Sequence, residues 1–274
     1  MRKNVLILLA FITINGHGQS LQDSTRQKYN LLSPVPGNEM RSFETDRPDV
    51  TESAYTVDAG HFQLETDLFK TERYNVHQVK TINNYINTAN LKLGITHSTD
   101  CQLVIATLNS SKIIDGSSIN KKSDFGGLTF RIKQNLWGND RRKTALSILP
   151  FVSVPVNSDS KISGGIVFPF AMSLAPGWDF GAQVETDIAA NQTGNDYQFN
   201  FLASATTSYP LCKNLDFFTE VVLTRNNETK NYEYFINGGP VYTIARNVNL
   251  DCGIYYGLKN ISSKTYFLGL SFRI

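Results

Sequence analysis

The sequence predicts an all-β protein: a closed antiparallel transmembrane β-barrel of about 12 strands, preceded by an extended periplasmic N-terminal segment. Three features lead to this prediction. The chain begins with an export signal, apolar and polar residues alternate from His61 onward, and the chain ends on one more alternating strand. Repeated segments of about ten alternating residues are typical of outer-membrane barrels.

The N-terminus has the parts of a secretory signal peptide. Arg2 and Lys3 precede a short apolar run over residues 5–14, and the small residues Gly16 and Gly18 follow it. A membrane-spanning helix needs about 20 apolar residues, roughly twice this run. We therefore expect residues 1–18 to be a signal peptide cleaved after Gly18.

The composition narrows the function classes. The mean hydropathy of −0.23 and the lack of another long apolar run argue against a helical membrane protein. A net charge of +2 without blocks of like charge gives no sign of a nucleic-acid partner. The 3 cysteines are too few for a disulfide scaffold, and Cys101 and Cys252 are expected to be lipid-facing or buried thiols.

Residues 19–60 show no lasting periodicity and contain three prolines, so we interpret them as an extended periplasmic segment. The barrel is expected to occupy residues 61–274. Its candidate strands are 61–71, 81–95, 101–110, 124–136, 143–155, 163–175, 178–190, 196–209, 215–225, 231–244, 248–258 and 264–274.

The connections between these strands alternate in length. Short turns are expected at residues 97–100, 138–140, 176–177, 210–214 and 245–247. Mostly longer polar stretches, such as 110–123 and 156–161, lie between them. Short periplasmic turns and longer outer loops are the usual asymmetry of such barrels. An even strand number then places both chain ends on the short-turn side.

Aromatic residues gather at the strand ends. One group lies beside short turns (Trp137, Trp178, Tyr209 and Tyr242), and another lies toward the opposite ends (Tyr197, Tyr232, Tyr234, Tyr256 and Tyr266). Two such belts are expected at the two membrane interfaces. On the clearer strands, outward side chains include Phe130, Val184 and Phe199. The strands near 101–110 and 143–155 are apolar on both faces, so their faces stay unassigned.

The last strand requires a partner. Its apolar face consists of Tyr266, Leu268, Leu270, Phe272 and Ile274, and its other face carries Arg273. An exposed strand of this kind would recruit other chains unless it closed against the first strand. The terminal Ile274 departs from the phenylalanine that usually ends outer-membrane barrels.

Charged side chains are expected to face the barrel interior. The acidic ones are Glu65, Asp67, Glu185, Asp187, Glu220 and Asp251, and the basic ones are Lys92, Arg131, Lys133 and Arg273. Buried charges need water or each other. We expect Glu65 and Asp67 to pair with Lys92 and Arg273 at the closing seam. The set forms either a locked network that fills a narrow lumen or a polar conduit for solutes.

A charged motif precedes the first strand. Residues 44–53 read E-T-D-R-P-D-V-T-E-S, and residues 60–65 read G-H-F-Q-L-E. This stretch of about 25 residues resembles the opening motif of the family named for the MetA pathway of phenol degradation, a family of outer-membrane transporters. The resemblance covers Thr45, Asp46, Arg47, Pro48, Asp49, Thr51, Glu52 and Ser53, and it implies a barrel that passes hydrophobic or aromatic compounds. We expect Arg47 to pair with lumen carboxylates and the segment to plug or gate the periplasmic mouth; the alternative is a solvated linker.

The functional hypothesis is a passive channel for small solutes, including hydrophobic or aromatic ones, in the outer membrane of a Gram-negative bacterium. Its gating residues would be Asp46, Arg47, Asp49, Glu52 and the inward charges named above other than Asp251. Its partners would be membrane lipid, the solute and the barrel-assembly machinery. A sealed barrel with ligand-binding outer loops is the alternative, and a lipid-modifying enzyme ranks third. No catalytic motif or metal-ligand spacing occurs, so neither a cofactor nor a metal is expected.

Overall fold

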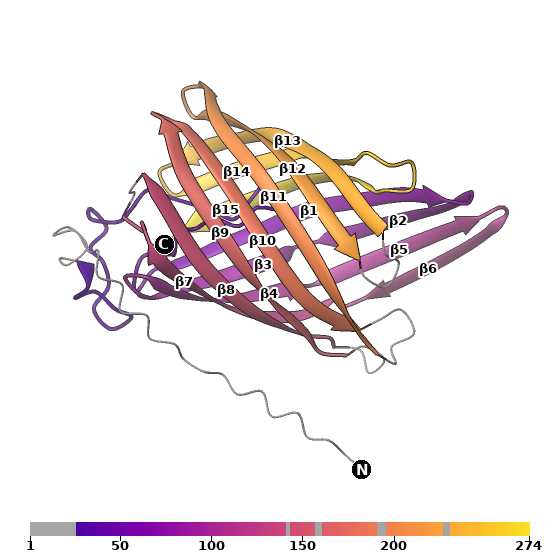
Figure 1. The fold of residues 1–274 in the computed structure, drawn as a ribbon, viewed down its shortest axis with the longest axis horizontal. Helices are drawn as coiled ribbons and strands as arrows, with labels where there is room; N and C mark the ends of the chain where they lie inside the picture. Colours follow the sequence, from indigo (N-terminus) through magenta and orange to yellow (C-terminus); the bar gives the residue numbers. More distant parts are fainter. Residues whose placement is uncertain (1–25, 141–142, 157–160, 191–195, 227–230) are drawn as a thin grey trace, which may run out of the picture.

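The computed structural model describes residues 26–140, 143–156, 161–190, 196–226 and 231–274. The predicted signal peptide lies outside the described residues. Over the described part, the chain forms one antiparallel sheet that closes into a barrel, because β1 pairs with β15 from Gln63↔Arg273 to Arg73↔Lys264 (Figure 1). The predicted all-β fold and the seam between first and last strand are confirmed.

The described residues form fifteen strand segments. Their bounds are β1 Phe62–Val76, β2 Val79–Ile86, β3 Thr88–Thr96, β4 Thr99–Ala106, β5 Leu108–Asp115, β6 Ser118–Asp124, β7 Gly127–Trp137, β8 Thr144–Val154, β9 Ser163–Ala175, β10 Trp178–Ala190, β11 Tyr197–Cys212, β12 Leu215–Asn226, β13 Asn231–Ala245, β14 Val248–Gly257 and β15 Lys264–Arg273.

These fifteen segments make a barrel of twelve strands, because three of the twelve strands are each interrupted once and so appear as two segments. β3 continues β2 after Asn87, β5 continues β4 after Thr107, and β7 continues β6 after Phe125 and Gly126. Asn87 has a φ of 53° and Gly127 one of 123°. Asparagine tolerates the first value, and only glycine adopts the second without strain. The predicted twelve strands are confirmed, and the interruptions are added by the structure.

The three interrupted strands extend beyond the rest of the barrel wall. The outer part of β1 together with β2, β5 and β6 forms a four-stranded extension, which projects to the right in Figure 1. The expectation that residues 110–123 form a loop was therefore wrong. These residues form the β5–β6 hairpin instead, turning at Gly116 with a φ of 56°. Alternating polar residues such as Ser111 and Asn120 pair as readily as apolar ones when both sheet faces meet water.

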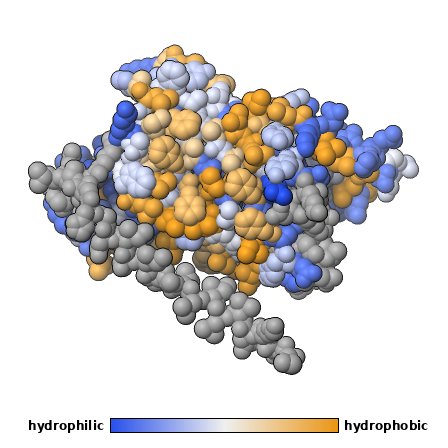
Figure 2. All heavy atoms as spheres, in the orientation of Figure 1, coloured by the Kyte–Doolittle hydropathy of each residue, from blue (hydrophilic) through white to orange (hydrophobic). Residues whose placement is uncertain are grey.

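The wall is apolar outside and polar inside. Phe130, Val184 and Ile188 are exposed on the outer surface, whereas Lys133, Gln183 and Ser147 are buried inside. Figure 2 shows an apolar band across the wall, with hydrophilic residues at the projecting end. Trp137, Trp178 and Tyr242 are exposed at the short-turn end, and the second aromatic group is exposed toward the other end. No described helix is long and apolar enough to cross a membrane.

Register assigns the two strands that sequence left open. Asp100 pairs with Lys133 and Gln102 with Arg131, so these side chains of β4 point inward and Cys101 is exposed outside. On β8, Ala145, Ser147 and Leu149 are fully buried. The prediction that Asp100 lies in a short turn is wrong, because Asp100 is the first inward residue of β4.

Candidate functional site: a charged segment inside the barrel

The chain that precedes β1 runs inside the barrel. We call residues 41–58 the lumenal segment. Ala54 and Asp58 in it have no exposed surface. Two wall glycines make room for it: a methyl group on Gly94 would overlap the backbone of Asp58, and one on Gly269 would overlap the guanidinium of Arg47. The wall is therefore shaped around this segment.

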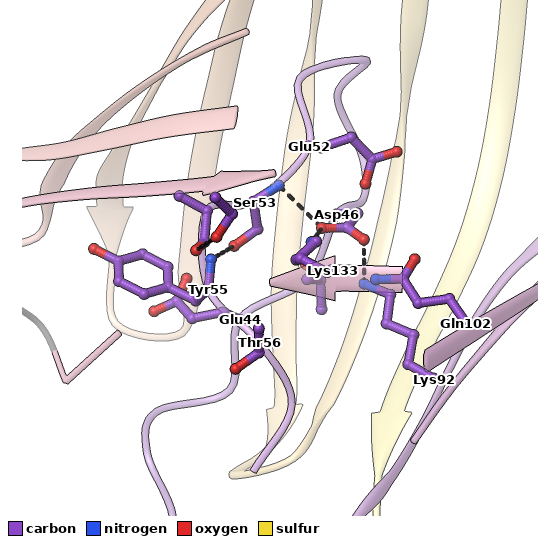
Figure 3. Close-up of polar contacts among 12 residues, drawn as sticks. Glu44, Asp46, Glu52, Ser53, Tyr55, Thr56, Lys92, Gln102 and Lys133 are labelled. Atoms are coloured by element: carbon purple, nitrogen blue, oxygen red, sulfur yellow. Dashed lines mark hydrogen bonds and ion pairs between the residues drawn. The ribbon is translucent and has the colours of Figure 1, made fainter. Parts of the chain in front are cut away.

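Asp46 is held by two lysines from the wall (Figure 3). Lys133 Nζ lies 2.6 Å from its Oδ1, and Lys92 forms a second ion pair with it. The Ser53 N–H also donates to Asp46 over 2.9 Å and closes a loop within the lumenal segment. Burial alone would raise the pKa of Asp46, but Lys133 and Lys92 outweigh burial and hold this pKa well below its ordinary value.

Glu65 on β1 binds the backbone at the start of that loop. Its Oε2 accepts the backbone N–H groups of Asp46 and Arg47 over 3.0 and 3.1 Å. Its other oxygen pairs with Lys92. The predicted Glu65–Lys92 pair is confirmed, and this carboxylate also binds the lumenal segment directly.

Arg47 bridges the seam between β1, β14 and β15. Its guanidinium donates to Asp67 over 2.6 Å and to both carboxylate oxygens of Asp251 over 2.7 and 3.2 Å. It also lies 5.7 Å from the centre of the Phe267 ring, within cation–π range. Although burial opposes the charge, the two carboxylates raise the pKa of Arg47 above its ordinary value. The expected pairing of Arg47 with lumen carboxylates is confirmed.

Glu220 on β12 binds the tip of the loop. It accepts the Val50 N–H over 3.1 Å, the Thr51 N–H over 2.7 Å and the Thr51 hydroxyl over 2.7 Å, while Asn237 donates from β13 over 2.6 Å. Burial and the nearby Glu220 carboxylate raise the pKa of Asp49 well above its ordinary value. Glu220 thus binds backbone N–H groups of the lumenal segment, and such contacts cannot be predicted from a sequence pattern.

Glu52 forms an ion pair with Arg131 of β7, and its N–H donates to Gln183 of β10 over 2.7 Å. Burial raises the pKa of Glu52 to about 7, and Arg131 offsets only part of that effect. The charge balance agrees with this shift. Lys92, Lys133 and Arg131 supply three positive charges, whereas five carboxylates interact with them: Asp46, Glu52, Glu65, Asp100 and, through Arg131, Glu185. Carboxylates are therefore in excess.

At the short-turn end, Asp58 forms ion pairs with three arginines. It pairs with Arg273 of β15 at 3.2 Å and with Arg41 and Arg26 at 3.5 Å each. The expectation that Arg273 pairs with Glu65 or Asp67 was wrong, because Asp58 lies inside the barrel and its carboxylate pairs with the Arg273 guanidinium. On the opposite wall, Asp100 accepts the Val57 N–H over 2.9 Å.

The structure therefore brings most of the predicted charges together around the lumenal segment. Glu185 and Asp187 lie on β10, where Glu185 interacts with Arg131 and Asn200 donates to Asp187 over 2.9 Å. Sequence reasoning missed Asp58, Asp100 and Arg41 as members of the cluster. The alternation of Asp100 with Gln102 was the available signal for one of them. Neither Asp58 nor Arg41 lies in a periodic stretch.

A cavity of about 480 Å³ lies beyond the lumenal segment, in the half of the barrel toward the projecting end. Val50 contributes to its lining from the segment, Leu202, Val222, Phe235 and Tyr255 supply apolar surface, and Lys70 and Glu72 supply charge. A β-bulge at residues 67–69 of β1 sets this arrangement, since it shifts the inward face from odd to even residues and points Lys70 inward. We call this cavity the vestibule. No group of three metal-ligating side chains occurs among the described residues.

Comparison with known proteins places this geometry in context. The family model described as "Putative MetA-pathway of phenol degradation" matches residues 45–274. The chain finds no match among curated proteins. Its fold is similar to an outer-membrane channel of the COG4313 group from Pseudomonas putida F1, with 10% identity, a TM-score of 0.56, and coverage of 84% of this chain and 100% of that one.

Two other solved structures share the fold. The NanC porin has 10% identity and a TM-score of 0.51, with 77% of this chain and 100% of that chain covered. The transport unit of the autotransporter AIDA-I from Escherichia coli has 11% identity and a TM-score of 0.51, with 92% and 97% covered. At such identities these likenesses concern the fold.

Proposed function

This chain belongs to the family of the MetA pathway of phenol degradation, and from that premise we propose that it is an outer-membrane channel whose lumenal segment gates passage of small solutes with apolar or aromatic parts. One observation carries the proposal. The lumenal segment is bound from opposite walls, by Asp67 and Asp251 on one side and by Lys133 and Gln183 on others. A solute in the vestibule would reach the short-turn end only after this segment moves.

The character of the contacts supports movement rather than permanent closure. The segment is held by hydrogen bonds and ion pairs, and the hydrophobic cluster at its base is small, with Tyr29, Val35 and Ala59 at its centre. Polar contacts of this kind can be exchanged for water at modest net cost, whereas an apolar plug cannot. A channel gate needs such a reversible seat.

The vestibule supports a solute class. Its volume lies in the range of pockets that bind small organic molecules. Its lining combines apolar side chains such as Phe235 and Val222 with the ammonium of Lys70, which lies 5.6 Å from the Tyr255 ring centre. This lining suits a molecule with an apolar or aromatic body and one polar group.

A disulfide lock tests whether the segment must move. Thr51 Oγ1 and Ser204 Oγ lie 2.7 Å apart, so the pair Thr51→Cys and Ser204→Cys brings two thiols together across the lumen. The oxidised double variant should lose solute uptake and recover it on reduction. Each single cysteine variant, treated identically, is the control.

The alternative is a sealed barrel that acts through its outer loops. The dense contacts of the lumenal segment are also consistent with such a sealed lumen. It predicts no solute flux in either redox state of the lock. Unchanged flux through the oxidised lock would instead refute a moving gate while leaving a channel that passes solute around the segment.

A further inference from the structure

Four cations, from β15, β1, β5 and β6, occupy one row on the outer surface at the extension. The register pairs Lys264 of β15 with Arg73 of β1, Arg73 with Ile82 of β2, Ile82 with Lys112 of β5, and Lys112 with Lys121 of β6. Residues paired in this way across neighbouring strands point to the same side of a sheet. The row therefore reads Lys264, Arg73, Ile82, Lys112 and Lys121, with four positive charges.

The row faces away from the lumen. Two residues before Arg73, Thr71 pairs with Tyr266, which is exposed on the outer wall beside Leu268. Because the side-chain period is two, Arg73 and Lys264 share that outer face. The intervening Glu72 lines the vestibule on the opposite face.

Within this row, like charges stand directly opposite each other. Arg73 faces Lys264, and Lys112 faces Lys121, an arrangement that destabilises a sheet unless an anion offsets it. The neighbouring outer-face positions supply none: among the described residues they are Thr71, Asn75, Lys80, Asn84, Ser110, Ile114, Ile119, Ser123 and Tyr266. The ion pair of the hairpin, Lys122 with Asp124 at 3.4 Å, involves Lys122, whose register position lies on the other face.

The position of the row points to a lipid. Tyr234, Tyr256 and Tyr266 are exposed on the outer wall at this end, where an aromatic belt marks the membrane interface. At Lys264 and Arg73 the row lies one side-chain repeat beyond Tyr266, roughly 7 Å farther along the strand, at the level of lipid headgroups. Lys264 already lies 4.6 Å from the ring centre of Tyr256.

We propose that this cationic row binds the phosphate groups of the phosphorylated glycolipid of the outer leaflet, lipopolysaccharide. The midpoints of the two cation pairs are three strand spacings apart, roughly 14 Å, which suits a headgroup that carries two separated phosphates. The row lies on an open convex wall rather than in a pocket, which suits a membrane lipid more than free phosphate. The inference requires the outer-membrane location but not the proposed gating.

The test uses the full mature chain purified in detergent, with bisphosphorylated lipid A, its fully dephosphorylated form and inorganic phosphate as probes. The variant Lys112→Gln with Lys121→Gln removes one cation pair, and Arg73→Gln with Lys264→Gln removes the other. Lys122→Gln with Lys143→Gln is a control with the same loss of charge at exposed sites outside the row. A heat-dependent gel shift verifies that each variant is a folded barrel.

We expect each row variant to bind lipid A roughly tenfold more weakly or worse, from the usual contribution of a basic residue at an anionic membrane surface. The control should bind lipid A like the parent protein, and dephosphorylated lipid A should bind weakly to all. Equal affinity of parent and row variants, an equal loss in the control, or inorganic phosphate binding as tightly as lipid A would overturn the proposal.

Discussion

Replacing Arg47 with alanine should unseat the lumenal segment. The substitution removes three hydrogen bonds at 2.6–3.2 Å and leaves the carboxylates of Asp67 and Asp251 without their shared cation. Both carboxylates belong to buried residues. Breaking a buried ion pair by removing one partner typically costs about 3–5 kcal/mol.

That cost weakens the seated state and leaves the barrel wall intact, because Arg47 belongs to the segment and not to a strand. A change of about 4 kcal/mol shifts the ratio of unseated to seated segment by roughly a thousandfold. Single-channel recording in planar bilayers should show larger or more frequent openings. Limited proteolysis should cut residues 41–58 faster than in the parent protein.

A control variant and a double variant test this prediction further. Arg246→Ala removes an exposed arginine in the β13–β14 turn and should change neither measurement. Adding Asp251→Asn to the Arg47 variant removes one of the stranded charges and should restore part of the seating. Conductance and protease protection in Arg47→Ala equal to those of Arg246→Ala would refute the idea that this ion pair seats the segment.

Three further perturbations follow from the same contacts. Gly269→Leu should open the channel because its side chain occupies the space of the Arg47 guanidinium, whereas Gly37→Leu, which has no neighbour within 4 Å of its added Cβ, should not; equal conductance of the two would contradict this. Conductance should rise from pH 5 to pH 8. The pKa of Glu52 is raised to about 7 in the seated state, so seating is strongest below the ordinary value of 4.5 and weakens by about 3 kcal/mol as pH rises from there through 7. Glu52→Gln should flatten this dependence over that interval, and an unchanged pH profile in the variant would refute the assignment. Leu202→Trp should fill part of the vestibule and slow uptake of an aromatic solute in liposome assays without changing the heat-dependent gel shift; uptake at the parental rate would argue against passage through the vestibule.

The barrel was predictable because its rule is local. Alternation in segments such as residues 197–206 decides which side chains meet lipid, and the lengths of the connections decide which end is which. The exposed Phe199 and Ile188, and the buried Gln183, follow from that rule alone. The inward charges on β1, β3, β7 and β12 were found for the same reason.

The rule fails where a strand departs from regular geometry. The bulge at residues 67–69 reverses the phase of β1, so Lys70 faces the vestibule although simple alternation would turn it toward lipid. Residues 110–123 are mostly polar and are predicted to form a loop, yet they pair along the β5–β6 hairpin from Asn109↔Asp124 to Asp115↔Ser118. Such features depend on partners in neighbouring strands, which a single strand's pattern does not contain.

The sequence by itself determined that this chain forms a closed barrel with a charged interior and that a charged motif precedes the first strand, because a period of two and a composition are local properties of the chain. Only the tertiary structure decided which charges meet. Arg47 reaches Asp251 across 204 residues, and Asp58 takes Arg273 from the partners that strand order suggested. These choices rest on a segment without periodicity that follows the shape and potential of the lumen, and both exist only once the barrel has closed.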